Sequence, residues 1–139
     1  MGTPEENKAL VRRFLDALGS GDVATAASCF DPERYYSHAH RADLAGTWEL
    51  MKERRRRNAF SDMSSETVAL VADGDRVVHH SRLTAVHTGE VLGVPATGRR
   101  VTVDHVELWR IDGDKIVEHW GGAAEMERLQ RELAGGDDG

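Results

Sequence analysis

The stretch that decides the fold is residues 93–120, GVPATGRRVTVDHVELWRIDGDKIVEHW. It begins with a loop marked by Gly93 and Pro95, and residues 100–111 then alternate between two sets of side chains with a period of two. That period is typical of a β-strand with two different faces. Asp112-Gly113 supplies residues that tolerate positive φ in a tight hairpin turn. We therefore predict a long strand over residues 100–111 and a second strand over residues 115–120.

Ionisable side chains interrupt this otherwise apolar hairpin. Carboxylate and imidazole groups are costly to bury, so the face that carries them either contacts water or lines a pocket. Which of them share a face depends on the turn, because a shift of one residue reverses the side-chain direction of one strand. A three-residue turn places His105, Glu107 and His119 together, whereas a two-residue turn brings in Asp104 or Glu118 instead. Histidine titrates near neutral pH and can therefore act as an acid or a base. The candidate catalytic residues are the histidines and the carboxylates near them in this hairpin: Asp104, His105, Glu107 and His119.

The N-terminal part of the chain is patterned for helices. Thr3 and Glu6 form a capping box, which predicts a first helix that ends at Gly19. A second short helix is expected after Asp22, and a third with Thr47 as its cap, running to about residue 59.

From Met63 the hydrophobic period changes from helical to two. Strands are predicted over residues 65–72 and 76–88, and a short polar helix over residues 125–133. Helices followed by antiparallel strands give an α+β fold, with N-terminal helices packed on a curved antiparallel sheet that forms a cone. We assign residues 1–134 to a single domain and residues 135–139 to a disordered tail.

Composition limits the classes of function. The formal net charge is −6 and the sequence pI is near 5.6, which argues against a nucleic-acid partner; the run of arginines at residues 54–57 is explained as a solvated helix face. Cys29 is the single cysteine, so no internal disulfide forms and a cytoplasmic location is expected. No apolar segment is long enough to span a bilayer and no signal peptide is apparent, so no membrane partner is expected.

Seven histidines raise the question of a metal site. The sequence contains no His-x-x-x-His helix pair and no cysteine pair, so no metal is expected. It also lacks a phosphate-binding loop, a dinucleotide-binding motif and a serine nucleophile elbow, and no cofactor is expected.

A set of short motifs in a fixed order resembles one family. In order along the chain they are Tyr-x-x-His at residues 35–38, DGDRV at 73–77, HTG at 87–89, GVPATGR at 93–99, RIDG at 110–113 and EHW at 118–120. Each motif is weak alone, but the set in this order resembles the SnoaL-like polyketide cyclases of the NTF2-like superfamily. The resemblance runs from about Glu6 to Leu133 and implies an NTF2-like α+β barrel with a pocket inside the cone.

The resemblance also implies a cofactor-free acid–base enzyme that closes a ring in a hydrophobic polyketide-type substrate. In an intramolecular aldol reaction, a base removes a proton next to one carbonyl and an acid protonates the oxygen formed on the other. In the family an Asp and a His on the two long C-terminal strands do this work. His105 falls at the histidine position and His119 at or near the aspartate position, while a second acid of the wider family is here Ala124.

The same resemblance suggests which residues hold the substrate. His38 is expected to face the pocket and His40 to face solvent, and Tyr35 or Tyr36 could donate a phenol hydrogen bond. The large aromatic side chains serve either the core or the pocket. The expected substrate-binding residues are Tyr36, His38, Trp48, Trp109 and Trp120.

Two classes of function stay open at this point. The first is an acid–base enzyme of small-molecule metabolism, acting by aldol closure or by epoxide opening, which likewise needs an acid and a base. The second is a non-catalytic binding or dimerisation module that keeps the fold, and the changes at His119 and Ala124 favour it. The density of ionisable groups in the hairpin favours the enzyme, because a binding scaffold gains nothing from burying them.

We predict a homodimer that forms through the outer face of the sheet, as similar proteins often do. Light scattering at micromolar protein concentration should give the mass of two chains. A monomer mass at that concentration would contradict the prediction.

Overall fold

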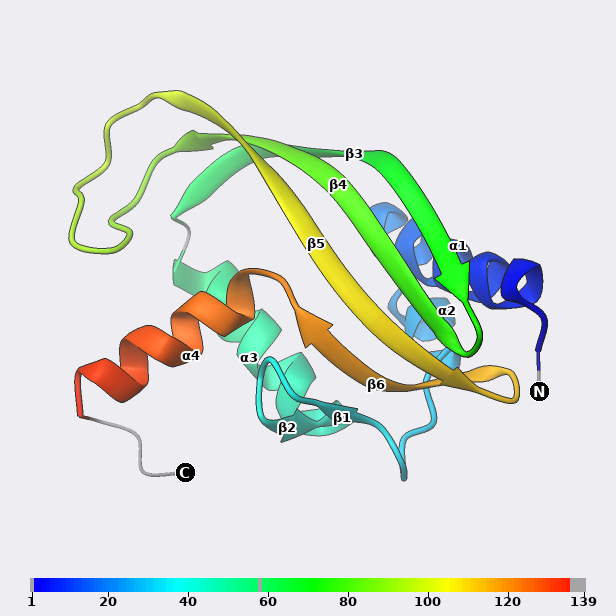
Figure 1. Ribbon diagram of the computed structural model, residues 1–139. Coiled ribbons are helices and arrows are strands. Elements are labelled where there is room, and N and C mark those ends of the chain that lie inside the picture. The colour runs from blue at the N-terminus through cyan, green and yellow to red at the C-terminus, as the bar shows by residue number, and fades with distance from the viewer. Residues whose placement is uncertain (1, 58, 136–139) are drawn as a thin grey trace.

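The computed structural model describes residues 2–57 and 59–135 and packs helices against one curved sheet (Figure 1). The predicted α+β fold is confirmed. The described strands form one sheet in the order β2-β1-β6-β5-β4-β3, whose two edge strands do not pair with each other, so the cone is not a closed barrel. The elements in chain order are α1 (Pro4–Ser20), α2 (Val23–Ser28), β1 (Tyr36–Ser37), β2 (Ala42–Asp43), α3 (Leu44–Arg57), β3 (Phe60–Asp73), β4 (Arg76–His87), β5 (Arg100–Asp112), β6 (Lys115–Gly121) and α4 (Ala123–Leu133).

The first two helices begin where the capping residues predict. The Thr3 hydroxyl accepts from the Glu6 backbone N–H at 3.1 Å, and the Glu6 carboxylate accepts from the Thr3 N–H at 3.0 Å. Asp22 caps α2 by accepting from the Thr25 N–H at 3.1 Å. The predicted end of α1 at Gly19 was wrong, because the left-handed residue that terminates the helix is Gly21, with φ 79°.

The predicted start of α3 was also wrong. The helix begins at Leu44, where the Asp43 carboxylate accepts the Gly46 N–H at 2.8 Å in place of the expected Thr47 cap. Thr47 is instead buried inside the first turns of the helix. The last helix, α4, begins at Ala123, two residues before its predicted start. Gly135 follows it in a turn, and residues 136–139 of the expected disordered tail lie outside the described residues.

The sheet is not antiparallel throughout. Strands β3 to β6 form the predicted antiparallel meander, but β1 pairs with β6 in parallel, with Tyr36 opposite Glu118 and Ser37 opposite His119. This pairing brings the loop after α2 alongside the last strand, which the sequence pattern alone did not predict.

A β-bulge sets which side of β6 faces inward. The hairpin turn contains two residues, with Asp112 opposite Lys115, and continued pairing in that register would turn His119 to the outer face. Val117 is an extra residue in β6, and beyond it the register shifts by one, so that Trp109 lies opposite His119. The two-residue turn and the bulge together produce the face that a three-residue turn would have given.

Helices α1 and α2 close one end of the sheet with aromatic side chains. Phe14 packs edge-to-face on Phe30 and Trp109, with ring centroids 4.9 and 6.0 Å apart. Val11 and Ile116 are fully buried beside them. This core holds the turn end of β5 and β6, the two strands that carry the candidate catalytic residues.

We predict that Gly121→Ala destabilises the protein by about 3 kcal/mol in urea unfolding. Gly121 ends β6 with φ 89°, and a Cβ there would lie 2.8 Å from the Val106 carbonyl oxygen. Gly113→Ala is the matched control, because Gly113 also has positive φ (66°), but a Cβ at that position would meet no atom of the described chain within 4 Å. The control should lose only about 1 kcal/mol. Equal losses for the two variants would contradict the close approach at Gly121.

Candidate active site

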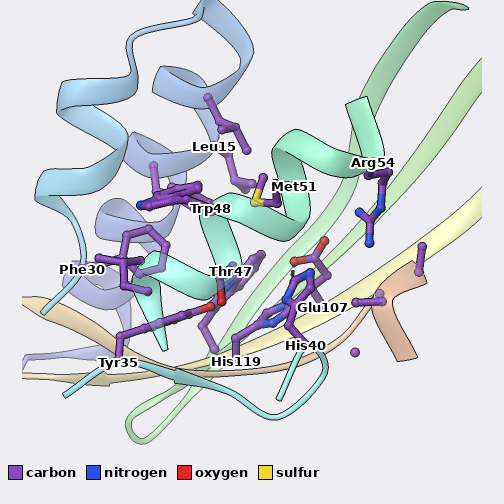
Figure 2. A pocket seen from close by; sticks show the side chains of 18 of the residues that line it. Leu15, Phe30, Tyr35, His40, Thr47, Trp48, Met51, Arg54, Glu107 and His119 are labelled. Atoms are coloured by element: carbon purple, nitrogen blue, oxygen red, sulfur yellow. Dashed lines mark hydrogen bonds and ion pairs between the residues drawn. The ribbon is translucent and has the colours of Figure 1, made fainter. Parts of the chain in front are cut away.

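A cavity of about 100 Å³ lies between the helices and the inner face of β5 and β6. Figure 2 shows that its two ends differ in chemistry. Aromatic and aliphatic side chains gather at one end, including Phe30, Trp48 and Met51. His40, Glu107 and His119 meet at the other end, with Arg54 on the same side of the cavity.

Glu107 is the centre of the ionisable end. Its Oε2 lies 2.9 Å from His119 Nε2, and its Oε1 lies 3.3 Å from His105 Nδ1. Burial alone would raise the pKa of Glu107, but the hydrogen bond from His119 and the attraction of the His119, His105 and His79 imidazoles outweigh burial and lower the pKa. Glu107 is therefore an ionised carboxylate that accepts a hydrogen bond from His119 and lies within ion-pair distance of His105.

The other nitrogens of these two histidines are also occupied. His119 Nδ1 is hydrogen-bonded to Ser37 Oγ at 2.8 Å, through the parallel pairing of β1 and β6. His105 Nε2 accepts the backbone N–H of Ala123, the first residue of α4, at 3.2 Å. His105 thus connects the half-buried carboxylate of Glu107 to the start of the last helix.

His40 completes the cluster. Its Nδ1 lies 3.0 Å from Ser37 Oγ, and its ring stacks on that of His119 with centroids 5.7 Å apart. Its Nε2 is buried and has no hydrogen-bond partner among the described residues. Burial, followed by the charges of His119 and Arg54, lowers the pKa of His40 to about 4, so His40 is neutral at pH 7.

Three of the four candidate catalytic residues meet at this site, and the fourth does not. His105 and His119 contact the shared carboxylate of Glu107. Asp104 points to the outer face, where it contacts His80 at 3.1 Å and Arg82 at 3.5 Å and is 60% exposed. The expectation that Asp104 belongs to the catalytic group was wrong, because the period of two that turns His105 inward turns its neighbour outward.

The expected substrate-binding residues divide in the same way. Trp48 and Trp109 line the cavity, whereas Tyr36, His38 and Trp120 lie on the outer face and do not line it. His38 stacks on Trp120 at 4.7 Å and bonds Glu118 at 2.7 Å. The expected directions of the two histidines were therefore reversed: His40, not His38, lines the cavity.

Three further residues belong to the site, and of these the sequence suggested only Tyr35, as an alternative to Tyr36 for a phenol hydrogen bond. Tyr35 lines the cavity, and burial raises its pKa, so it stays a neutral phenol that can donate. Ser37 is fully buried between two histidines. Arg54 belongs to the arginine run assigned to solvent but lines the cavity. The alternation of inward Tyr35 and Ser37 with outward Tyr36 is a pattern of period two, but it does not show which strand this segment pairs with.

Helix α4 covers the cavity mainly through polar contacts. Ala124 is its buried residue, whereas Met126 and Leu133 are 62% and 79% exposed. Arg54 holds Glu127 of α4 through two hydrogen bonds of 3.0 and 3.2 Å. The helix follows Gly121-Gly122, both with positive φ, and this arrangement suits a cover that can move.

Comparison with known proteins places this geometry in a family. The family model of the SnoaL-like polyketide cyclases matches residues 8–130. This chain belongs to that family. The resemblance seen in the sequence motifs is thereby confirmed, and the match includes every residue of the cluster around Glu107.

Solved structures of similar proteins agree on the fold. AclR from Streptomyces galilaeus, described as a candidate hydroxylase, is 31% identical, with 93% of this chain and 98% of that chain covered and a TM-score of 0.68. TsrD from Streptomyces laurentii is 26% identical, with coverages of 96% and 98% and a TM-score of 0.68. IdmH from Streptomyces antibioticus, described as a candidate polyketide cyclase, is 24% identical, with coverages of 89% and 98% and a TM-score of 0.69. No curated protein matches the chain.

Neither a metal cluster nor a membrane-spanning helix occurs in the described part of the chain. Residues 2–57 and 59–135 contain no group of three or more His, Cys, Asp or Glu side chains arranged to hold a metal ion. No helix in the same ranges is both long and apolar enough to cross a membrane.

We predict that Glu127→Gln loosens α4. The change removes the negative charge of Glu127, whose Oε1 lies 3.0 Å from Arg54 Nε. A partly exposed ion pair of this kind contributes up to about 1 kcal/mol, which is about fivefold in the equilibrium constant for opening of α4. Hydrogen exchange of the α4 amides, followed by mass spectrometry, should quicken by up to about fivefold. Glu53→Gln is the control, because its pair with Arg56 lies within α3. Unchanged α4 exchange in Glu127→Gln would show that the ion pair does not hold the helix.

Proposed function

We propose that this protein is a cofactor-free acid–base enzyme that closes a ring in a hydrophobic, polyketide-type substrate. The observation that carries the proposal is a carboxylate, Glu107, shared by His105 and His119 at the polar end of an aromatic cavity. Perturbed ionisable groups that converge in a cavity are typical of catalytic sites. Membership of the SnoaL-like polyketide cyclase family supports the same class of reaction.

The cluster has the properties that such a reaction needs. Ring closure of the aldol type requires one group to take a proton from carbon and to return a proton to oxygen. Imidazole can do both near neutral pH. An ionised Glu107 beside His119 stabilises the imidazolium that forms when the base takes up a proton, because opposite charges 2.9 Å apart in a half-buried site attract each other.

The aromatic end would hold the apolar body of the substrate. Phe30, Trp48 and Trp109 offer ring faces and edges to a planar or polyene substrate. The cavity of about 100 Å³ is smaller than the roughly 300–1,000 Å³ usual for drug-sized ligands. A multi-ring substrate therefore requires the cavity to widen, and movement of α4 about Gly121-Gly122 is the route that the weak packing of that helix supports.

Hydrolysis by a serine nucleophile is not favoured, although Ser37, His119 and Glu107 are hydrogen-bonded in series. A nucleophile must reach the substrate. Ser37 is 0% exposed and does not line the cavity, so its hydroxyl serves the histidines.

A second candidate function, a binding or dimerisation module, has its own supporting observation. An apolar row crosses the outer face of the sheet in register, formed by Val71, Val78, Leu108 and Trp120 on four successive strands. Val71 is 55% exposed. Such a row suits a second copy of the chain, and it is compatible with catalysis in the cavity on the other face.

The proposal is tested by proton exchange, which does not require the natural substrate. A slowly exchanging aryl ketone such as a tetralone, incubated in D2O, should lose its α-proton NMR signal faster with the protein than with buffer. Glu107→Gln should lower the protein-dependent rate by about a hundredfold or more, because the variant removes the counter-ion of the imidazolium.

Glu118→Gln is the matched control. Glu118 is also a β-strand carboxylate bonded to a histidine, His38, but it lies on the outer face. Its variant should exchange the ketone at the parental rate. Catalysed closure of a γ,δ-epoxy alcohol without ketone exchange would replace aldol closure by epoxide opening. No catalysis of either reaction by the parent protein would favour the binding module.

A further inference from the structure

Three histidines line the cavity, and within the described chain five of their six ring nitrogens have partners. Both nitrogens of His105 and both of His119 are engaged, by Glu107, Ala123 and Ser37. His40 uses Nδ1 toward Ser37, and its Nε2 is buried with no partner. A buried imidazole nitrogen without a partner is unusual. Because His40 lines the cavity, a ligand that reaches this nitrogen would satisfy it.

Ser37 connects this nitrogen to the rest of the cluster. Its hydroxyl oxygen accepts the His40 backbone N–H at 3.0 Å, and it also meets His40 Nδ1 at 3.0 Å and His119 Nδ1 at 2.8 Å. A hydroxyl donates one hydrogen and has two acceptor lone pairs. With one lone pair used by the backbone, Ser37 can accept from one of the two imidazoles and donate to the other.

The protonation state of His119 decides which imidazole donates a hydrogen bond to Ser37 and which accepts one from it. Glu107 is ionised and only accepts, so His119 Nε2 carries a hydrogen toward it. When His119 is neutral, its Nδ1 is bare and accepts from Ser37, so Ser37 accepts from His40 Nδ1–H. His40 Nε2 is then a bare lone pair, the form of a base.

The alternative state reverses every bond in the chain. When His119 is positively charged, its Nδ1–H donates to Ser37, and Ser37 donates to His40 Nδ1. A neutral His40 then carries its hydrogen on Nε2, the form of an acid. Both states use the full hydrogen-bonding capacity of Ser37, so they differ in what His40 Nε2 offers to a ligand: a bare lone pair in one state and a hydrogen in the other.

We propose that His40 Nε2 is the atom that takes the proton from the substrate and returns it, and that Ser37 relays the charge to His119 beside Glu107. The inference rests on the proposed acid–base function and names the catalytic residue within it. His40 is a catalytic residue in this scheme, and Ser37 and His119 act through it.

The proton balance is complete without any outside reagent. A substrate C–H bond next to a carbonyl breaks, its proton bonds to His40 Nε2, and its electron pair stays on the substrate as an enolate. The His40 Nδ1 proton passes to Ser37 Oγ, and the Ser37 hydroxyl proton passes to His119 Nδ1. After the enolate carbon bonds to the second carbonyl, the new alkoxide takes the proton from His40 Nε2 and the three transfers reverse.

The electrostatic surroundings explain why a relay is needed. The groups that act on the His40 ring are His119 from β6, Arg54 from α3, Glu107 from β5 and Glu127 from α4. Burial and the first two of these keep the pKa of His40 near 4, so a positive charge on His40 itself is disfavoured. Through Ser37, His40 takes up a proton yet stays neutral, and the charge settles on His119, 2.9 Å from the carboxylate.

The tautomers can be read by long-range ¹H–¹⁵N NMR of the imidazole rings in the full-length protein, with the His40 signals assigned by their loss in His40→Gln. At about pH 8, where an ordinary histidine is neutral, His40 should carry its hydrogen on Nδ1. As the pH is lowered, His40 should switch its hydrogen to Nε2 without becoming doubly protonated, with the same midpoint as the appearance of a hydrogen on His119 Nδ1. Ser37→Ala should abolish this switch while the protein stays folded.

Three results would overturn the relay. The first is a His40 that carries its hydrogen on Nε2 at about pH 8. The second is a His40 that becomes doubly protonated together with His119. The third is a tautomer switch that survives in Ser37→Ala. The parent protein alone decides the first two, so the test does not depend on whether the variant folds.

The ketone-exchange assay separates this inference from the proposed function. His40→Gln should lower the exchange rate by about a hundredfold, and His38→Gln, a change at the neighbouring histidine on the outer face, should leave it unchanged. Loss of exchange in Glu107→Gln together with a parental rate in His40→Gln would overturn the role of His40 and leave the acid–base function standing. Absence of exchange by the parent protein would count against the proposed function itself.

Discussion

The interaction on which the site depends is the pairing of a half-buried carboxylate with two imidazoles. A carboxylate removed from water is strongly destabilising unless donors surround it, and Glu107 has His119 at 2.9 Å and His105 at 3.3 Å. Each histidine is held in turn by a second contact, to Ser37 or to the Ala123 N–H. The requirement to satisfy one charge therefore fixes β1, β5, β6 and the start of α4 relative to one another.

The hairpin of β5 and β6 carries residues of both the apolar core and the ionisable cluster. The turn end of β5 and β6 is held by the aromatic core around Phe14 and Trp109, and the other end carries the ionisable cluster. The bulge at Val117 turns His119 inward, directly opposite Trp109 of the apolar core. A rigid apolar base supporting a polar group of this kind keeps hydrogen-bond distances fixed, which proton transfer needs.

The contacts that hold α4 over the cavity differ from those of the apolar core. Helix α4 buries little apolar surface and is held by ion pairs such as Arg54 with Glu127, so it can part from the rest at modest cost. Because His105 Nε2 accepts the Ala123 N–H, any movement of α4 also changes the surroundings of Glu107. Access to the cavity and the state of its polar end are therefore coupled.

The sequence by itself determined the α+β fold, the hairpin and the family, because period-two alternation, Asp-Gly turns and capping residues such as Thr3 and Asp22 act over a few neighbouring positions. It also identified His105, Glu107 and His119 as ionisable groups on one possible face. Tertiary structure alone decided that face, because a single extra residue at Val117 reverses a strand. Tertiary structure also decided that His40 and Ser37 join the cluster and that His38 does not. The reason is the parallel pairing of β1 with β6, which unites residues far apart in the chain, such as Ser37 and His119. A pairing over that distance leaves no local pattern in the sequence.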